Sequence, residues 1–173
     1  VSPKREDAEM THVRYMDRIR DYYIAQGYEK PYRWAHHEEV PFAPLVKPLS
    51  QSNVTLFSTS DVSVQRAEGE ALPDQETTVG DVYSVPWDTP VERLYSRQES
   101  FDRYATTLDD LNSYLPLTRL EEFVESGRIG SVTENFHNVN RGYSQKLMLQ
   151  TSAPAALEIC RREKVDVAVL TPV

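Results

Sequence analysis

One polar segment, Asn135–Ser144, is predicted as a loop and holds the side chains best suited to proton transfer and to binding a carboxylate. It contains His137, Arg141 and Tyr143. An arginine can hold a substrate carboxylate through two parallel hydrogen bonds, and a histidine or tyrosine can give or take a proton. We therefore predict His137 and Tyr143 as candidate acid or base and Arg141 as a substrate-binding residue. An ordinary polar surface loop ahead of a helix is the alternative interpretation.

A second group of polar side chains lies at the end of the first clear strand of the sequence. Residues 53–59, NVTLFST, have the β-branched and aromatic content of a strand. The strand ends in Ser58, Thr59, Ser60 and Asp61. Because ligands of α/β proteins gather beyond the carboxyl ends of strands, we predict that Ser58, Thr59 and Asp61 bind substrate. A plain turn rich in serine and aspartate has the same composition.

The sequence gives less support for thiol chemistry or for a metal site than for the two groups of polar side chains described above. Cys160 is the single cysteine and lies at helical spacing from apolar residues, with no second cysteine to form a C-x-x-C motif. We predict that it is a small packing residue rather than a redox group. The adjacent His36 and His37 would point to opposite sides of an extended segment, and no third ligand has a diagnostic spacing. We therefore predict no metal and no cofactor.

Composition excludes several classes of protein. The 173 residues carry 19 Lys and Arg against 27 Asp and Glu, a formal net charge of −8. A nucleic-acid-binding protein needs a cationic surface, so nucleic acid is not expected as a partner. No apolar run reaches the length of about 18 residues that a membrane span requires, and one cysteine forms no intrachain disulfide. Because no secretory signal pattern is present, the predicted location is cytoplasmic.

Three segments with different patterns follow one another along the chain. Residues 1–27 are predicted as an N-terminal amphipathic helix that ends at Gly27 and packs its apolar stripe on this chain or on a partner. The stripe consists of Met10, Val13, Met16, Ile19 and Tyr23. Residues 28–52 are predicted as an extended connector, because three prolines between residues 41 and 48 prevent regular structure and aromatic residues precede them. Residues 53–173 are predicted as one α/β domain.

The middle of this domain has weaker patterns. Residues 62–90 are predicted mostly as loop, with a short strand at 82–85, and a loop of that length is typical of a lid or another mobile functional segment. A helix with an apolar face is predicted from Leu117 to Ser126, and Gly127 ends it.

The prediction of an α/β fold rests on the last part of the chain. A helix is predicted from Ala153 to Glu163, and the run VAVL at residues 167–170 is apolar at every position. A strand without alternation is typical of a parallel sheet covered by helices, so we predict that this strand is buried on both faces. The sequence thus predicts a three-layer Rossmann-like domain with a mostly parallel sheet. Because a domain seldom ends straight after such a strand, we expect residues 53–173 to be truncated at the C-terminus.

Six motifs, in a consistent order, are spread over most of the chain from Tyr28 onward. They are YEKPYRW (28–34), PFAPLVKPLS (41–50), DDLN (109–112), PLTRL (116–120), ESGRIG (125–130) and VDVAVLTPV (165–173). Together with Ala153-Pro154 before the last motif, they resemble the selenoprotein B family of glycine, sarcosine, betaine and D-proline reductases. The resemblance implies an α/β fold and reductive cleavage of a carbon–nitrogen bond in a small amino acid or N-methylated amine.

The resemblance also implies a redox-active selenocysteine or cysteine. In the family this residue follows closely after the segment corresponding to Leu170–Val173, so the expected catalytic residue lies beyond Val173. We predict that Val173 lies beside the Ser58–Asp61 loop and that Thr171 helps to bind substrate. This placement requires residues 53–59 and 165–170 to form parallel strands of one sheet.

The leading function is therefore a subunit or fragment of a thiol- or selenol-dependent reductase. Its expected partners are a small nitrogen-containing substrate and another protein or a second copy of the chain, with no nucleic acid and no membrane. The alternative function is a non-catalytic subunit that binds a partner through its N-terminal helix and aromatic connector.

Overall fold

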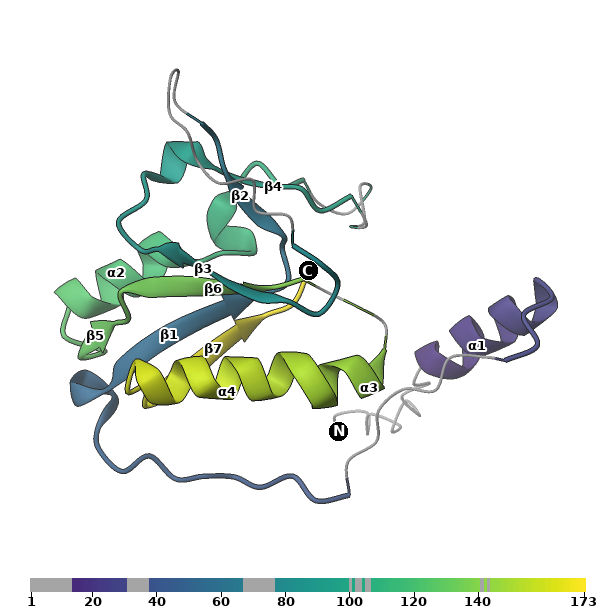
Figure 1. Cartoon of the computed structure of the whole chain (residues 1–173), viewed down its shortest axis with the longest axis horizontal. Coiled ribbons are helices and arrows are strands. Elements are labelled where there is room, and N and C mark those ends of the chain that lie inside the picture. Colours follow the sequence, from purple (N-terminus) through teal and green to yellow (C-terminus); the bar gives the residue numbers. More distant parts are fainter. Residues whose placement is uncertain are drawn as a thin grey trace, which may run out of the picture. The chain divides into compact units, whose positions relative to one another are not determined.

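The computed structural model describes residues 14–30, 38–66, 77–99, 101, 104, 107–140, 142 and 144–173 (Figure 1). The chain divides into two compact units, Val1–Pro41 and Phe42–Val173. The second unit contains every described strand, and with them most of the predicted site residues.

In the first unit the described helix is α1, Tyr15–Ala25. It ends as predicted, because Gly27 has a φ of +90°, a left-handed conformation that glycine adopts without a steric penalty. No residue of α1 is buried within the described chain, and Met16 is 58% exposed. Burial of the apolar stripe against a partner therefore stays a prediction. Met10 and Val13 of that stripe lie outside the described residues.

The second unit is built on a five-stranded sheet that is mostly parallel. Its strands are β1 (Asn53–Ser58), β3 (Val82–Pro86), β5 (Ser131–Val132), β6 (Asn135–Val139) and β7 (Val167–Thr171). β5, β6 and β7 all pair with β1 in parallel, and β3 pairs with β6 in antiparallel orientation. The prediction of a mixed α/β fold with a mostly parallel sheet is confirmed, and so is the parallel pairing of β1 with β7.

β1 is the central strand, and other strands pair with it along both of its edges. Val54 pairs with Val132 of β5 and also with Val167 of β7, and Phe57 pairs likewise with β6 and β7. A residue has only two strand neighbours, so β5 and β6 share one edge of β1 and β7 occupies the other. The break between β5 and β6 includes Thr133, whose N–H still donates to the Val54 carbonyl oxygen at 3.0 Å.

The apolar core lies between the sheet and α2, Leu117–Glu125, which is the helix predicted there. β1 directs Val54 and Leu56 into this core, and β6 contributes Phe136, whose ring lies edge-on to Trp87 with centroids 6.2 Å apart. Full burial of one such side chain stabilises the folded state by about 1.5–3 kcal/mol. This face of the sheet is closed.

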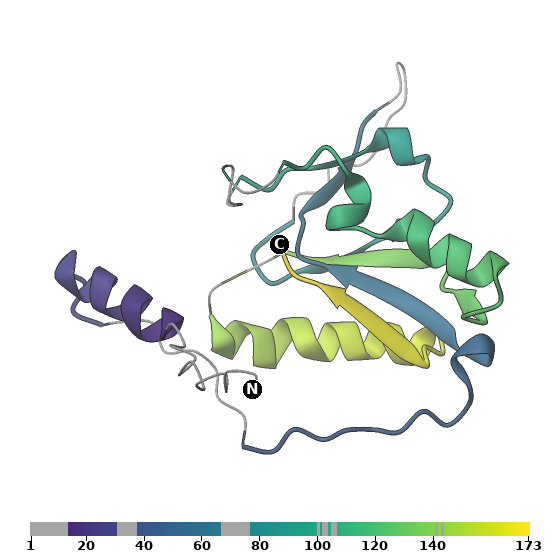
Figure 2. The ribbon, with the colours of Figure 1, turned by 180° about the vertical axis from the view of Figure 1, so that it is seen from behind.

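A continuous helical segment covers the opposite face (Figure 2). It consists of α3 (Gln145–Leu147), a π-helical turn (Met148–Ser152) and α4 (Ala153–Arg162). The π-helical turn comes just before Pro154, which has no N–H to donate, so the regular ladder of hydrogen bonds is interrupted there. Ser152 Oγ donates to the Gly80 carbonyl oxygen at 2.7 Å and fixes the start of α4 next to β3.

The predicted burial of β7 on both faces is wrong. Val167 and Val169 are half-buried against the apolar core, but Ala168 and Leu170 on the other face are exposed, and Leu170 is 71% exposed. α4 is anchored near β3 and β6 and leaves the last strand uncovered. Among the described residues β7 also pairs with β1 alone, so it is an edge strand.

Residues 62–90, predicted mostly as loop, contain more regular structure than expected. β2 (Val62–Val64) pairs with β4 (Leu94–Ser96) in a separate two-stranded antiparallel sheet. The short strand predicted at 82–85 is confirmed as β3. Residues 67–76 of this region lie outside the described part of the chain.

Candidate functional site

The carboxyl ends of three parallel strands meet at one edge of the sheet. β1 pairs there with β6 and β7 at Ser58, opposite Asn138 and Thr171. The Thr59 N–H donates to the Thr171 carbonyl oxygen at 3.2 Å, and the Val173 N–H donates to Thr59 Oγ1 at 2.9 Å. The predicted position of Val173, beside the Ser58–Asp61 loop, is therefore confirmed.

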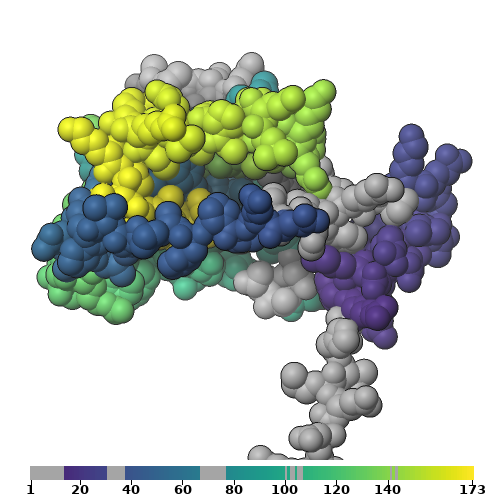
Figure 3. All heavy atoms as spheres, turned by 90° about the horizontal axis from the view of Figure 1, so that it is seen from below, coloured from purple at the N-terminus to yellow at the C-terminus, as the bar shows by residue number. Residues whose placement is uncertain are grey.

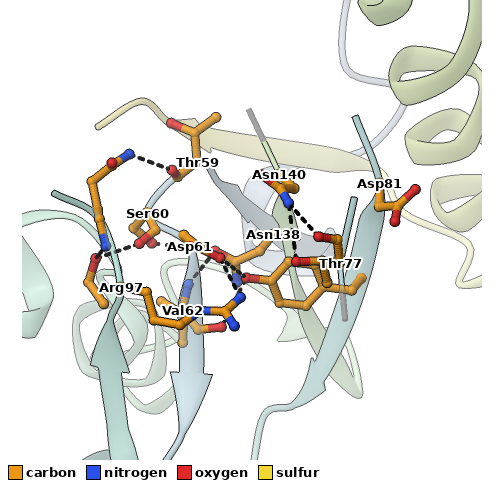
Figure 4. Close-up of polar contacts among 12 residues, drawn as sticks. Thr59, Ser60, Asp61, Val62, Thr77, Asp81, Arg97, Asn138 and Asn140 are labelled. Carbon is orange, nitrogen blue, oxygen red and sulfur yellow. Dashed lines mark hydrogen bonds and ion pairs between the residues drawn. The ribbon is translucent and has the colours of Figure 1, made fainter. Parts of the chain in front are cut away.

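The serines of this loop are buried in a hydrogen-bonded network (Figure 4). Ser58 Oγ lies 2.8 Å from Ser60 Oγ and 3.1 Å from the Tyr114 carbonyl oxygen. Asn138 Oδ1 accepts from Ser60 Oγ at 3.4 Å and from the Val62 N–H at 3.3 Å. The Ser58 hydroxyl, which we predicted to bind substrate, therefore makes its hydrogen bonds within the protein.

Asp61 is also engaged by neighbouring side chains. Its Oδ1 accepts from Arg97 Nη2 at 2.7 Å and from the Tyr83 hydroxyl at 3.3 Å. Burial, and then the charge of Asp61, raises the pKa of Tyr83, so this phenol stays protonated at neutral pH. The hydrogen bond to Asp61 raises the pKa of Arg97. Both hydrogen bonds, from Arg97 and from Tyr83, go to Oδ1, and the Arg97 guanidinium already neutralises the charge of the carboxylate that a substrate amine would need.

Thr59 and Thr171 differ in their remaining hydrogen-bonding capacity. Thr171 Oγ1 donates to the Phe57 carbonyl oxygen at 3.3 Å, whereas Thr59 Oγ1 accepts from Val173 and keeps its own proton for another acceptor. Of the predicted substrate-binding hydroxyls, Thr59 is thus the one best placed to donate to a ligand at this edge.

His137 lies away from that edge, on the face of the sheet toward α4. Its side chain is 0% exposed, its Nδ1 is 2.9 Å from Ser84 Oγ, and its Nε2 is 3.4 Å from Glu163 Oε2. The ring packs on Phe57 with centroids 4.7 Å apart. Burial is the main reason why the pKa of His137 is lowered from its ordinary value, although Glu163 opposes the effect. In this conformation His137 has no access to a substrate.

An apolar cavity of about 620 Å³ lies between α4 and the exposed face of β7. Figure 3 shows the surface on this side, hollowed beside the yellow-green helix. The cavity is lined by Phe57, Ser58, Thr59, Val139, Met148, Ser152, Ala153, Ala156, Leu157, Cys160, Ala168, Leu170, Thr171 and Pro172. None of these residues is charged, so the cavity suits an apolar group better than a zwitterion.

Cys160 lies in the wall of this cavity and is only half-buried. Burial, followed by the negative charge of Glu163, raises the pKa of the thiol. A thiol with a raised pKa is a weak nucleophile at neutral pH. Cys160 is therefore a lining residue of the cavity, with a thiol that stays protonated at neutral pH.

Two of the predicted site residues, Arg141 and Tyr143, lie outside the described residues, as do His36 and His37. The neighbouring Asn140 is described: its Nδ2 donates to the carbonyl oxygen and to Oγ1 of Thr77, at 3.2 and 3.1 Å. The roles of Arg141 in substrate binding and of Tyr143 in proton transfer therefore remain predictions.

Ser84 and Glu163 are polar residues of this face that sequence reasoning missed. They lie 53 residues before and 26 residues after His137 in the chain. No local motif joins them, and the antiparallel pairing of Ser84 with His137 is what brings the first of them into place.

Within the described ranges, no cluster of three or more His, Cys, Asp or Glu side chains could hold a metal ion. No helix in this part of the chain is long and apolar enough to cross a membrane.

Comparison with protein-family models, with curated proteins and with solved structures found no match for this chain. Support for a function therefore comes from the residues and from their geometry.

Proposed function

We propose that this chain is a subunit or part of a thiol- or selenol-dependent reductase that cleaves a carbon–nitrogen bond in a small amino acid or N-methylated amine. The observation that carries the proposal is the hydrogen bond of 2.9 Å between the Val173 N–H and Thr59 Oγ1. In the family that the sequence resembles, the redox cysteine or selenocysteine follows closely after the segment equivalent to Leu170–Val173. A nucleophile at that position would lie next to the Ser58–Asp61 loop, at the edge where α/β proteins bind ligands.

The chemistry needs a soft nucleophile and a proton. A thiolate or selenolate forms a bond to carbon while the carbon–nitrogen bond breaks, and the amine leaves with the electron pair and takes up a proton. A dithiol then attacks the sulfur or selenium, and the carbon leaves with the electron pair of that bond and takes up a proton to give the reduced product. The dithiol ends as a disulfide and the nucleophile is again a thiolate or selenolate. Thr59 can donate a hydrogen bond to the substrate, and Tyr143 and Arg141 keep their proposed roles in proton transfer and carboxylate binding.

Our proposal also specifies the type of α/β fold. We take residues 53–173 as a three-layer Rossmann-like domain, with α2 and α4 on opposite faces of the sheet. A cytoplasmic location and assembly with another protein or a second copy fit an acidic chain of this kind.

The alternative, a non-catalytic subunit that binds a partner, is favoured by one observation. Leu149, Leu157 and Leu170 are 69%, 49% and 71% exposed, and the last two line the apolar cavity. Exposed apolar patches of this kind mark interaction surfaces in many proteins.

Two measurements separate these functions. The first is the reading frame of the gene together with the intact mass of the purified protein, where the reductase requires the frame to continue past Val173 into a cysteine or selenocysteine codon. The second is the release of ammonia or amine from glycine, sarcosine and betaine, and the ring opening of D-proline, with dithiothreitol as reductant, in the wild type, in Thr59→Val and in the matched control Thr59→Ser.

We expect Thr59→Ser to retain activity and Thr59→Val to lose about tenfold or more, as expected for one hydrogen bond to a charged substrate. A frame without a redox codon, or equal activity in the two variants, would exclude the proposed site. A frame without the codon would also favour the partner-binding subunit.

A further inference from the structure

The outer edge of β7 has backbone groups to which a further strand could pair. The Thr59 N–H donates to the Thr171 carbonyl oxygen, so Thr171 directs its backbone groups to β1. Because successive residues of a strand direct these groups to opposite sides, Ala168 and Leu170 direct theirs to the outer edge. Among the described residues β7 pairs with β1 alone, so this edge is open.

Residues 42–47, which we call the strap, are anchored at the start of β7. Lys47 Nζ lies 2.6 Å from Asp166 Oδ2, and soon after the strap the Gly130 N–H donates to the Leu49 carbonyl oxygen at 3.0 Å. The strap runs toward this anchor and β7 runs away from it, so the two have opposite directions (Figure 1). With about 3.4 Å per extended residue, residues 42–46 match the five residues of β7 in length.

The apolar side chains of the strap are exposed in the described conformation. Phe42 is 92% exposed, and Leu45 and Val46 are exposed as well. Single exposed apolar residues are common, but these three lie in one short segment that is tethered to a strand of the cavity wall. Packing of the strap on the edge of β7 would remove both apolar surfaces from water.

The proline of the strap allows one of the two possible alternations along β7. Pro44 has no N–H, so its nitrogen cannot face β7 in the middle of a new pairing without loss of a hydrogen bond. Ala43 and Leu45 therefore have to direct their backbone groups to β7, while Pro44 faces away from it.

The ion pair gives the same alternation independently. If Lys47 lies opposite Asp166, each earlier residue of the strap lies opposite a later residue of β7. The two hydrogen-bonded pairs of this register are Leu45 with Ala168 and Ala43 with Leu170. Each pair exchanges two backbone hydrogen bonds and sets a large side chain beside a small one on the face toward α4.

We propose that the strap closes on β7 as a further antiparallel strand of the five-stranded sheet and covers the open side of the cavity between β7 and α4. In the closed state Leu45 lies against Ala168 and completes the wall of the cavity. Val46 lies on the opposite face of the sheet, beside the half-buried Val167. The described conformation is the open state. The strap does not depend on reductase activity.

The open and closed states are close in free energy. Closure forms backbone hydrogen bonds and buries apolar side chains, but it also fixes side chains that rotate freely in the open state. Pro44 limits the loss of backbone entropy, because its φ is restricted in both states. Closure also covers an open strand edge, which is otherwise a site for association with other chains.

The experiment is disulfide trapping in the full chain, with Cys160→Ala to remove the native cysteine. Ala43→Cys/Leu170→Cys puts two thiols on one face in the closed register, where the Cα atoms of such a pair are about 5.5 Å apart. The matched control Phe42→Cys/Leu170→Cys has nearly the same tether, but its thiols point to opposite faces. With oxidised glutathione as oxidant, we expect the monomer of the first pair to lose both thiols at least about tenfold faster than the control.

A second pair of variants tests the backbone hydrogen bonds without added cysteines. Leu45→Pro removes a donor that faces β7 in the closed state, whereas Val46→Pro removes one that faces away from it. The amide exchange of Ala168, corrected for the intrinsic rate, should be about twofold or more faster in Leu45→Pro than in the wild type. In Val46→Pro it should stay unchanged.

The proposal is overturned if the two cysteine pairs react at the same rate, if no disulfide forms within the monomer, or if the two proline variants have equal exchange at Ala168. A disulfide between two chains, seen as a dimer on a non-reducing gel, also overturns it, because β7 then binds the strap of a second copy. If a cysteine variant does not fold, the two proline variants still decide.

Discussion

The two faces of the central sheet are built from alternate residues of the same strands, yet they differ in character. Toward α2, the strands contribute Val54, Leu56 and Phe136, all at most 2% exposed and packed into one apolar core. Toward α4, neighbouring positions carry the buried His137 and the exposed Leu170. The first face is closed and apolar apart from the buried network of Ser58, Ser60 and Asn138 at its edge. The second face combines His137 and its polar neighbours Ser84 and Glu163 with an open cavity. Stability therefore depends mainly on one face, and ligand binding or conformational change is expected on the other.

The largest effect should come from a matched pair of leucine truncations. Leu56→Ala in the closed core should lower the free energy of unfolding by about 2–5 kcal/mol, because it leaves a cavity that the core cannot fill. Leu170→Ala should change it by less than about 0.5 kcal/mol, because that side chain is 71% exposed. Urea unfolding measures both. Similar losses in the two variants would mean that the face toward α4 is covered in solution.

Asn138→Ala is the next test, at the end of β6 on the core side. Asn138 Oδ1 is the acceptor for Ser60 Oγ and the Val62 N–H, both in buried surroundings. Its removal should lower the free energy of unfolding by about 1–3 kcal/mol. Asn140→Ala, which loses a half-buried contact to Thr77, is the control and should have a smaller effect. An equal effect of the two substitutions would contradict the importance assigned to the buried network.

The pH dependence of stability should show the contribution of His137, which is buried on the face of the sheet toward α4. The pKa of folded His137 is lowered, so in mild acid the unfolded chain binds a proton that the folded chain does not. Stability should therefore be highest above about pH 6.5 and fall as the pH decreases below it, by at most about 1.4 kcal/mol per pH unit. Urea unfolding at several pH values, compared with His137→Asn, isolates this contribution. A wild type and variant with parallel pH profiles would assign the slope to other groups.

The smallest effect is expected for Cys160→Ala. The thiol is half-buried in the wall of an open cavity, so its loss should change the free energy of unfolding by less than about 1 kcal/mol. Any thiol-dependent activity of the complete protein should stay nearly unchanged, because the raised pKa disfavours the thiolate. Near-complete loss of activity in a folded Cys160→Ala protein would instead make Cys160 a catalytic residue.

The periodicity of apolar residues in the sequence predicted the strands and helices that pack on the core. This is because burial of one face of a strand or helix requires apolar residues at the period of that structure. β1, α2 and α4 lie where the alternation and helical spacing placed them, and the parallel pairing of β1 with β7 followed from their apolar content. The exposure of Leu170 was missed because an apolar run indicates what a strand can bury and not whether a helix covers it. β2 and β4 were missed because three residues are too few for a period.

The candidate site was predictable only where residues follow a strand directly. Thr59 and Val173 come together because both β1 and β7 end there. The burial of His137 was not predictable, since its neighbours Ser84 and Glu163 come from distant parts of the sequence. The side-chain alternation of β6 directs His137 to the α4 face and Asn138 to the core, and a loop prediction for Asn135–Ser144 could not show this.

The position of β1 at the centre of the sheet has a consequence for how the chain folds. Its contacts with Ser131 and Asp166 join residues 78 and 113 positions apart. Closing such long loops is slow, so formation of the parallel sheet should limit the folding rate. During synthesis β1 emerges well before β5, β6 and β7, and its apolar residues have to wait for partners. In that interval the strand is open to association with other chains, and chaperones would have their greatest effect on the yield of this protein.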